Sequence, residues 1–350
     1  MKKTGLYIHF PFCRRACFYC HFFKKKHRPA LAAIYLRYLA REIRRRRDPG
    51  RPLDTVYIGG GSPSLLTAPQ ISALLETAAK NFQIDEKNEI TLEANPEDLA
   101  APQLMSFRRA GVNRLSIGVQ SFQERDLRFL KRTHSAAQAL QAMEQARDAG
   151  FTNISLDLII GLETQTSRSM ALNFRQIETL KPAHVSVYIL EGVPRQAADE
   201  RDARLYFQVR QSLLDLGYDH YEVSNFCRPG KASRHNLKYW KNQPYIGLGP
   251  SAAGFLDGRD YRNHPDLKKY YAGLDKGILP EQKTAPLPAA LRRIITGLRL
   301  LDGIPASAFK SFPAPTDFLL TEGFLVRHGK NIAVPPQKIL LLNEILGYFV

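Results

Sequence analysis

The chain is poor in cysteine, tryptophan and methionine, with four, one and four copies among its 350 residues. A chain of this length can bury a core without cross-links, and four cysteines give no disulfide framework of the kind that small secreted domains need. No apolar run is long enough to span a bilayer. The first residues, MKKTGLYIHFPFC, have a basic start but lack the apolar run and cleavage site of a signal peptide. We therefore expect a cytoplasmic protein.

Acidic residues are also scarce, because 33 aspartates and glutamates face 50 lysines and arginines, which gives a net charge of +17. Two runs carry much of the excess, KKKHR at 24–28 and RRRR at 44–47. Such charge can attract nucleic acid, anionic lipid or an acidic small molecule. The arginine run lies inside a helix-like segment and is explained by a solvated helix face. Neither run has the interleaved aromatic residues that stack on bases, which disfavours a nucleic-acid partner.

Three of the four cysteines lie in one short stretch, CRRACFYC at 13–20, and the fourth is Cys227. A disulfide would use two of the three and leave the third unpaired. A structural zinc ion needs four ligands, so His21 or the distant Cys227 would have to complete the set. An iron–sulfur cluster is held by thiolates, and three of them would leave one iron of a four-iron cluster without a protein ligand. The stretch favours the cluster over zinc.

Strand-like and helix-like segments alternate through the first half of the chain. The predicted strands are 6–10, 55–59, 89–94, 114–120, 153–160 and 184–190, and the helical stretches between them are 31–47, 68–80, 99–110, 136–149 and 167–180. Alternation of this kind is typical of a parallel sheet built from βα units. Six such units fit either a doubly wound sheet or an incomplete barrel.

The alternation of side chains along the strands separates these two folds. In the fourth strand Leu115, Ile117 and Val119 share one face, while Ser116, Gly118 and Gln120 share the other. Strands of a doubly wound sheet are buried on both faces and read as continuously apolar. A small, polar inner face instead indicates an open barrel with a wet lumen. We therefore predict an α/β fold, a partial (βα)6 barrel of the TIM type with an open lumen, and a smaller, mainly helical C-terminal domain.

Three segments are predicted for the domain organisation: a barrel domain at 1–195, a connecting region at 196–260 and the C-terminal domain at 261–350. The connecting region is rich in Gly, Tyr and Asn and contains HNLKYW at 235–240.

In parallel βα folds the working groups lie at the carboxyl ends of the strands. The cysteine stretch follows the first predicted strand, and the glycine run GGGSPS at 59–64 follows the second. Further strands carry Glu93, Gln120 and Asp157, and Arg132 follows the fourth strand after one helical stretch. A lone aspartate in an apolar strand is costly unless it is paired or serves a ligand. Together these groups predict one binding rim.

The chain resembles the radical S-adenosylmethionine proteins. The Cys-x3-Cys-x2-Cys pattern of CRRACFYC matches their signature, and YIHFPFC, YIGGGSPS, LEANPE, GVNRLSIGVQSF, LDLIIGL and HNLKYW resemble the branch that contains anaerobic coproporphyrinogen III dehydrogenases and heme chaperones. The resemblance runs from about Leu6 to Gly254 and implies a [4Fe–4S] cluster on Cys13, Cys17 and Cys20. It also implies contacts to S-adenosylmethionine from Tyr7, Tyr19, Gly60, Gly61, Ser62, Glu93, Gln120, Arg132 and Asp157.

Two features favour the chaperone side of this branch. The dehydrogenases have a further cysteine two residues after the third, and this chain has Phe22 at that position. The HNLKYW motif at 235–240 matches the motif of the chaperones. The resemblance implies that His235 ligates heme iron, although the motif could equally pack the C-terminal part of the chain. Two turns depart from the family pattern, GLETQT at 161–166 and LEGVP at 190–194. Both lie near the expected cofactor or substrate end of the rim.

The leading functional expectation is a cytoplasmic protein that binds a [4Fe–4S] cluster, S-adenosylmethionine and heme, and delivers heme to acceptor proteins such as membrane-bound respiratory enzymes. The basic excess would suit contact with an anionic membrane, and the chain is expected to act as a monomer or homodimer. The alternatives are a radical enzyme of porphyrin biosynthesis that acts on coproporphyrinogen III, which Phe22 disfavours, and a radical enzyme that modifies RNA. A zinc-stapled binding protein leaves the strand-end residues unexplained.

Overall fold

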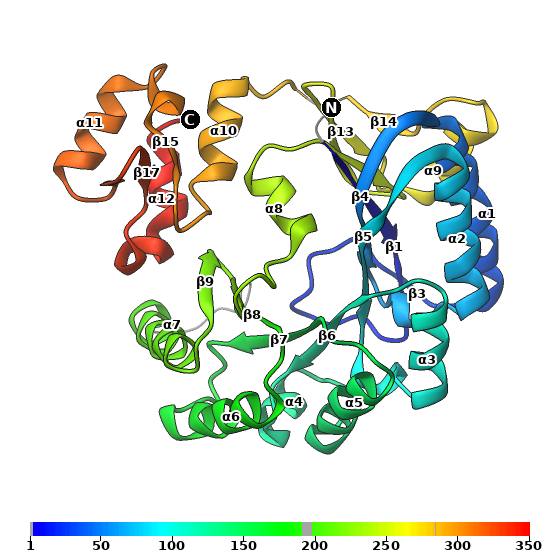
Figure 1. Ribbon diagram of the computed structural model, residues 1–350, viewed down its shortest axis with the longest axis horizontal. Helices are drawn as coiled ribbons and strands as arrows, with labels where there is room; N and C mark the ends of the chain where they lie inside the picture. The colour runs from blue at the N-terminus through cyan, green and yellow to red at the C-terminus, as the bar shows by residue number, and fades with distance from the viewer. Residues whose placement is uncertain (1–2, 191–197, 284) are drawn as a thin grey trace.

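The computed structural model describes residues 3–190, 198–283 and 285–350. Six parallel strands follow one another in the sheet, in chain order and each beside the next (Figure 1). They are β1 (Thr4–Phe10), β4 (Asp48–Gly60), β5 (Phe82–Ala94), β6 (Arg114–Gln120), β7 (Ile154–Ile160) and β8 (His184–Ile189). The predicted α/β fold is confirmed, because successive parallel strands are joined by helices as in a partial barrel.

Helices cover the outside of this arc of strands (Figure 1). They are α1 (Pro29–Arg45), α2 (Ala68–Asn81), α3 (Ala101–Arg109), α4 (Glu124–Phe129), α5 (Ala136–Asp148), α6 (Ser167–Leu180) and α7 (Ala198–Asp215). Three of them start with a reciprocal capping box, in which an N-cap hydroxyl and the side chain three residues later each bond the other's backbone N–H. Thr67, Ser135 and Thr166 are these N-cap residues. Most helix starts predicted from the sequence therefore have a local chemical cause.

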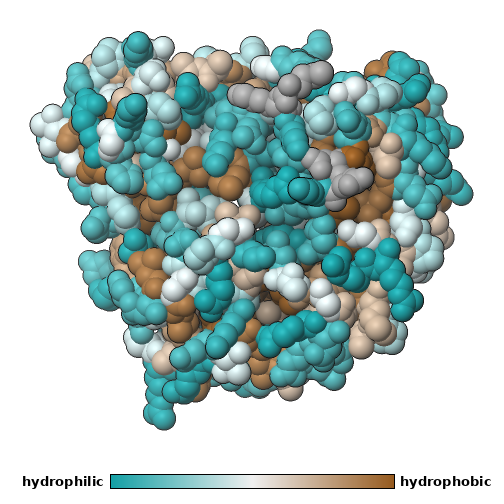
Figure 2. All heavy atoms as spheres, in the orientation of Figure 1, coloured by the Kyte–Doolittle hydropathy of each residue, from teal (hydrophilic) through white to brown (hydrophobic). Residues whose placement is uncertain are grey.

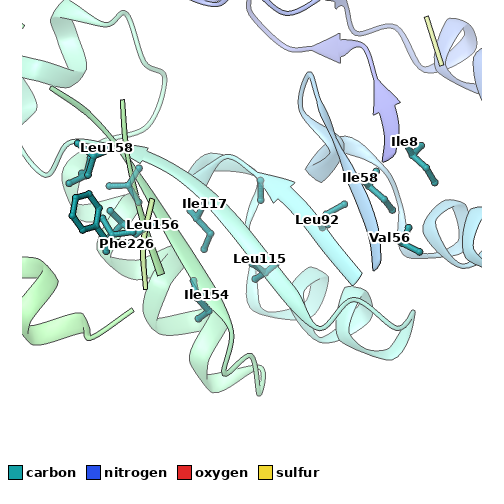
Figure 3. Packing of buried hydrophobic residues seen from close by; sticks show 14 of the residues in the cluster. Ile8, Val56, Ile58, Leu92, Leu115, Ile117, Ile154, Leu156, Leu158 and Phe226 are labelled. Carbon is teal, nitrogen blue, oxygen red and sulfur yellow. The ribbon is translucent and has the colours of Figure 1, made fainter. Parts of the chain in front are cut away.

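The core lies between the strands and these helices. Leu115 and Ile117 of β6, Leu156 of β7 and Ile58 of β4 are fully buried there. Figure 3 shows such side chains in successive strands. Their burial on one face of each strand leaves the other face to small and polar side chains, as the alternation predicted. Apolar burial of this kind contributes roughly 25 cal/mol for each Å² removed from water.

Later parts of the chain lengthen the sheet at both edges. The full order is β14-β13-β12-β11-β1-β4-β5-β6-β7-β8-β10-β9, and the strands added after β8 are β9 (Asp219–Glu222), β10 (Asn225–Cys227), β11 (Tyr245–Leu248), β12 (Ala253–Leu256), β13 (Arg259–Asn263) and β14 (Glu281–Gln282). β11 pairs in parallel with β1, and the other five pairings are antiparallel. Within the described residues the two edge strands β14 and β9 do not pair with each other, so the sheet is open.

Two helices are placed by this extension. α8 (Arg234–Trp240) lies within the arc of strands, whereas α9 (Leu267–Asp275) packs against α1 on the outside (Figure 1). Glu42 of α1 is fully buried and accepts hydrogen bonds from the Gly249 N–H, at 2.8 Å, and from the Tyr270 hydroxyl, at 2.7 Å. These bonds join the first helix to the later strands and to α9.

The last part of the chain forms a small unit beside the barrel (Figure 1). It contains α10 (Ala289–Gly297), α11 (Pro313–Thr321), α12 (Leu342–Gly347) and a three-stranded sheet of β15 (Ile304–Pro305), β17 (Asn331–Ala333) and β16 (Val326–His328). The division of the chain at 195 and 260 stays a prediction, and the first boundary lies outside the described residues, as do residues 191–194 of the LEGVP turn. None of the described helices combines the length and the apolarity that crossing a membrane would need.

Candidate functional site

The glycine-rich turn after β4 holds the start of the cysteine loop. The Gly61 N–H donates to the Phe10 carbonyl at 2.7 Å, and the Ser62 N–H donates to the Phe12 carbonyl at 2.8 Å. A Cβ atom on Gly61 would lie 2.7 Å from both of these oxygens, so only glycine permits this approach. Gly60 has a φ of +107°, a conformation that also favours glycine. The turn and the cysteine loop are therefore built as one unit.

The three clustered cysteines are free thiols on or just after the short strand β2 (Phe12–Cys13). β2 pairs with β3 (Lys25–Lys26), which closes the loop, and the Cys20 N–H donates to the Cys17 carbonyl at 3.3 Å. All three are partly buried, whereas Cys227 is buried on β10. Within the described residues no three Cys, His, Asp or Glu side chains gather closely enough to hold a metal ion as they stand. Residues 14–20 have no helix or strand.

Arg132 connects Cys17 to the glycine-rich turn. Its Nη1 donates to the Cys17 Sγ at 3.6 Å, its Nη2 donates to the Asn95 Oδ1 at 2.7 Å, and the Asn95 Nδ2 donates to the Ser62 Oγ at 2.9 Å. The Nε of Arg132 is buried and has no hydrogen-bond partner within the described residues. These side chains line a small pocket beside Cys17, whose full lining is Arg14, Arg15, Cys17, Ser62, Asn95, Glu97, Lys131, Arg132 and Thr133. A cationic group and an open donor at this pocket suit an anionic ligand group.

Glu93 lies on the lumen face at the end of β5. Its Oε2 accepts from the Gly60 N–H and its Oε1 from the Tyr57 hydroxyl, both at 2.8 Å. Burial raises the pKa of this carboxyl to about 7, against the lowering effect of both hydrogen bonds. A cationic ligand group would favour the carboxylate form, so Glu93 is suited to an ammonium or sulfonium ligand.

Asp157 stands on the same face of β7. The Ser116 hydroxyl lies 3.2 Å from both of its carboxylate oxygens, and burial raises its pKa. Gln120 ends β6 with a φ of +67°, in the left-handed region that few residues other than glycine adopt. A strained residue at a strand end is common where a side chain is aimed at a ligand.

Tyr7 lies on β1 and Tyr19 in the cysteine loop. The Tyr7 hydroxyl is 3.0 Å from the His9 Nδ1, and the His9 Nε2 is 2.9 Å from the Phe23 carbonyl. The carbonyl can only accept, so Nε2 carries the proton and Nδ1 accepts from Tyr7. Burial lowers the pKa of His9 to about 4, which keeps the ring neutral. Tyr19, in the cysteine loop, lies near Arg132 and Cys17, and burial raises its pKa.

His235 lies on an element separate from the cysteine loop. It lies on α8, is fully buried, and its ring nitrogens contact the Thr55 Oγ1 and the Tyr239 hydroxyl, each at 2.8 Å. Thr55 pairs with Gly5 near the start of β1, whereas the glycine-rich turn is at the end of β4. Burial lowers the pKa of His235 to about 3. The structure therefore brings the cysteine loop, the glycine-rich turn, Glu93 and Gln120 to the carboxyl ends of the strands, whereas Tyr7 and Asp157 lie midway along β1 and β7 and His235 lies nearer the amino ends.

The GLETQT turn, which departs from the family pattern, is folded onto α4. The Thr164 hydroxyl donates to the Asp126 Oδ1 at 2.6 Å, and the Gln165 Nε2 donates to the Ile159 carbonyl at 2.9 Å. Gln165 is buried, so this turn has an internal set of bonds that replaces the usual proline and glycine.

Sequence reasoning missed three residues at the site. Tyr57 donates to Glu93, Asn95 connects Ser62 to Arg132, and Arg114 is 1% exposed with its Nε unpartnered among the described residues. The strand alternation could have found Tyr57 and Arg114, since they share the lumen face with Gly59 and Ser116.

The residues present fit a four-iron cluster with an open iron and a zwitterionic cofactor. Three thiols, softer ligands than oxygen donors, lie on one loop without a fourth. The Arg132 guanidinium contacts Cys17, and the Glu93 carboxylate is bonded to the glycine-rich turn, which tolerates no Cβ at Gly61 and holds the start of the loop. Cys13, Cys17 and Cys20 would hold the cluster, and Glu93, Arg132 and Asp157 would hold polar groups of the cofactor.

This fold and this loop are those of a radical SAM protein. Residues 7–175 match the sequence model of the family described as "Radical SAM superfamily". This segment contains most of β1, the parallel strands β4, β5, β6 and β7, all three clustered cysteines and every predicted cofactor residue except His235.

Two relatives that match nearly the whole chain show which group of radical SAM proteins it belongs to. The chain is 34% identical to the heme chaperone HemW of Synechocystis sp., over 87% of this chain and 80% of that protein. It is 32% identical to the heme chaperone HemW of Escherichia coli, over 100% of this chain and 99% of that protein. The chain thus belongs to the family of radical SAM proteins that contains HemW.

A solved structure matches the fold as well. Coproporphyrinogen III oxidase (HemN) from Escherichia coli, a radical SAM enzyme, superimposes with a TM-score of 0.87 at 26% identity, over 99% of this chain and 90% of that chain. The later strands and the C-terminal unit therefore also belong to a fold that a porphyrin enzyme uses.

Proposed function

We propose that this protein is a heme chaperone that binds a [4Fe–4S] cluster, S-adenosylmethionine and heme, and transfers heme to acceptor proteins. The observation that carries the proposal is the similarity to proteins named HemW. The match to the Escherichia coli protein covers 100% of this chain and 99% of that protein. The arrangement of Cys13, Cys17 and Cys20 beside Arg132 and the glycine-rich turn supports the cluster and cofactor part of it.

Each part of the site has a separate task in this proposal. A bound cluster supplies electrons one at a time. Arg132 orients the loop through Cys17 and Asn95, and Glu93 offers a carboxylate on the lumen side.

Heme ligation by His235 remains part of the proposal. Both ring nitrogens are occupied, by Thr55 and Tyr239, so iron could reach the imidazole only after α8 moves away from β4. A neutral imidazole, which the low pKa of His235 ensures, is the form that ligates iron.

Oxidation of coproporphyrinogen III is the second candidate, because the fold superimposes on HemN over 99% of the chain. The residue two positions after the third cysteine is Phe22, whose side chain is 65% exposed. Its ring cannot supply a thiol there, and this favours the chaperone.

The experiment that tests the proposal is a hemin titration of anaerobically reconstituted protein, followed through the Soret band. Wild type is compared with His235→Ala and with a variant in which Cys13, Cys17 and Cys20 are all Ala. We expect saturable, stoichiometric heme binding that the triple variant retains and His235→Ala weakens. No saturable binding by the wild type would remove the chaperone proposal, and propionate decarboxylation of coproporphyrinogen III would favour the second candidate.

The heme acceptor proposed from the sequence is a membrane-bound protein. The basic surface of this chain would help the chaperone to approach the membrane that holds the acceptor. Arg37, Arg41, Arg44 and Arg45 project from one exposed face of α1, here called the α1 arginine face. Figure 2 shows that hydrophilic side chains cover much of the face drawn, with hydrophobic ones scattered among them. Charge of this kind attracts anionic headgroups.

A further inference from the structure

α8, which carries the HNLKYW motif, lies inside the arc of strands rather than outside it with the other barrel helices (Figure 1). Its first N–H groups are bonded by a lumen carboxylate, because Glu89 of β5 accepts from the Arg234 N–H at 3.2 Å and from the His235 N–H at 3.0 Å. The helix is thus fixed to the strands at its start, and His235 faces the lumen.

The imidazole of His235 packs against two tyrosine rings of neighbouring strands. Its centroid lies 5.2 Å from that of Tyr57 on β4 and 6.4 Å from that of Tyr7 on β1. The strand beneath it approaches closely at Gly5, where a Cβ would lie 2.7 Å from the Lys238 Cδ, 3.0 Å from the Thr55 Oγ1 and 3.2 Å from the His235 Cε1. The hydrogen bonds to Thr55 and Tyr239 fix the plane of the imidazole.

Both tyrosines lead from this ring toward the cofactor end of the lumen. The Tyr57 hydroxyl donates to Glu93, which also accepts from the Gly60 N–H of the glycine-rich turn. The Tyr7 hydroxyl donates to His9, whose Nε2 bonds the Phe23 carbonyl just after the cysteine loop. A displaced tyrosine ring would therefore move a group that the cofactor is expected to touch.

We propose that His235 is a positioning residue for the cofactor site: its ring supports Tyr57 and Tyr7 from the amino-terminal side of the lumen, and through them holds Glu93 and the glycine-rich turn in place. This role rests on the proposed binding of S-adenosylmethionine. It differs from heme ligation, because it needs the shape of the ring and not a nitrogen lone pair.

The test is the affinity of reconstituted protein for S-adenosylmethionine, measured by equilibrium dialysis for wild type, His235→Leu and His235→Phe. Leucine removes the ring, whereas phenylalanine keeps an aromatic ring and removes the ligating nitrogens. We expect His235→Leu to weaken cofactor affinity about tenfold, the effect of losing one well-made contact. His235→Phe should recover most of that loss, while a heme-ligating role would be lost in both variants.

Two controls keep a general loss of stability apart from a positioning effect. Leu319→Ala opens the core of α11, far from the lumen, and should lower stability without changing cofactor affinity. Tyr57→Phe removes the hydroxyl bonded to Glu93, and adding His235→Leu to it should cost less than His235→Leu costs alone, because the two act on the same group.

Three outcomes would overturn the inference. Equal cofactor affinity in wild type and His235→Leu would show that the ring does not support the site. Equal losses in His235→Leu and His235→Phe would assign the effect to the ring nitrogens. A wild type that binds no S-adenosylmethionine would remove this inference together with the cofactor part of the proposed function, whereas failure of heme binding alone would leave the inference standing.

Discussion

At the scale of single residues, Glu93 is the clearest case of a group whose charge depends on a ligand. Burial raises its pKa to about 7 from a usual value of 4.5. The folded chain without ligands then holds this proton more firmly than the unfolded chain does. The protonated Glu93 carboxyl therefore adds to the free energy of unfolding. This contribution is fully present below pH 4.5 and is lost as the pH rises through 7.

We therefore predict that Glu93→Gln stabilises the protein without cluster or cofactor at pH 8 relative to wild type, by about 3 kcal/mol. At pH 5 the two proteins should differ little, since Glu93 is then protonated in the folded chain. Thermal unfolding at both pH values measures this. The same stabilisation at pH 5 and pH 8 would contradict a buried carboxyl with a raised pKa.

Gly61 gives the second prediction at this scale. Its substitution by alanine places a methyl group 2.7 Å from the carbonyl oxygens of Phe10 and Phe12. Backbone atoms cannot move aside cheaply, so we expect Gly61→Ala to lower the free energy of unfolding by about 1–3 kcal/mol. It should also lower the iron and sulfide content after reconstitution, because the turn holds the cysteine loop.

Gly347→Ala is the matched control, since nothing lies within 4 Å of a Cβ at that position. It should reconstitute like the wild type. If Gly61→Ala also took up a full complement of iron and sulfide, the contact between the turn and the loop would have no part in cluster binding.

Sequence reasoning reached much of the site at this scale because strand alternation places every second residue on the lumen face. It identified Glu93, Asp157 and Ser116 as lumen residues, but it did not predict that Tyr57 bonds Glu93 or that Ser116 bonds Asp157 across neighbouring strands. Which residues of two strands lie opposite depends on register, and β4 and β5 pair with two register shifts that no pattern in the chain reveals.

At the scale of elements, the sequence predicted the long barrel helices well and the short lumen helix not at all. α2 and α5 have many turns, an apolar stripe and capping boxes. α8 has seven residues, too few for a periodic pattern to be recognised. It is held by tertiary bonds, chiefly the Glu89 carboxylate at its first N–H groups.

Because α8 depends on the Glu89 carboxylate, removing that carboxylate should destabilise the protein. Glu89→Ala would leave one buried and one partly buried N–H group without their acceptor, and we expect the free energy of unfolding to fall by about 1–2 kcal/mol. Denaturant unfolding gives the value. Glu76→Ala, on the exposed face of α2, removes the same charge at the surface and should cost little. Equal losses in the two variants would show that the carboxylate does not hold α8.

At the scale of the whole molecule, the charge excess is the feature that packing does not explain. The buried salt bridges use few of the 50 basic side chains, and the α1 arginine face is left in solvent apart from Arg41, which bonds Asp275. Arg37, Arg41, Arg44 and Arg45 recur at helical spacing, so a flat surface can meet them together. An anionic membrane is such a surface.

We therefore predict that the protein binds vesicles containing phosphatidylserine and does not bind vesicles of phosphatidylcholine alone, as measured by sedimentation. Replacing Arg37, Arg44 and Arg45 together by Gln should weaken binding on the order of 100-fold at low salt, because each cation near an anionic membrane contributes about 1 kcal/mol. Raising the salt should reduce the difference, since exposed charges are screened beyond about 10 Å at 0.1 M.

A second triple variant separates the face from the net charge. Lys310, Arg327 and Lys330 are exposed in the C-terminal unit, and replacing them by Gln removes the same three charges at a different place. If the α1 arginine face meets the membrane, this variant should bind vesicles nearly as well as wild type. Equal weakening by the two variants would mean that the overall excess of +17 draws the protein to anionic lipid from any direction, and heme delivery at a membrane would then need a docking surface other than α1.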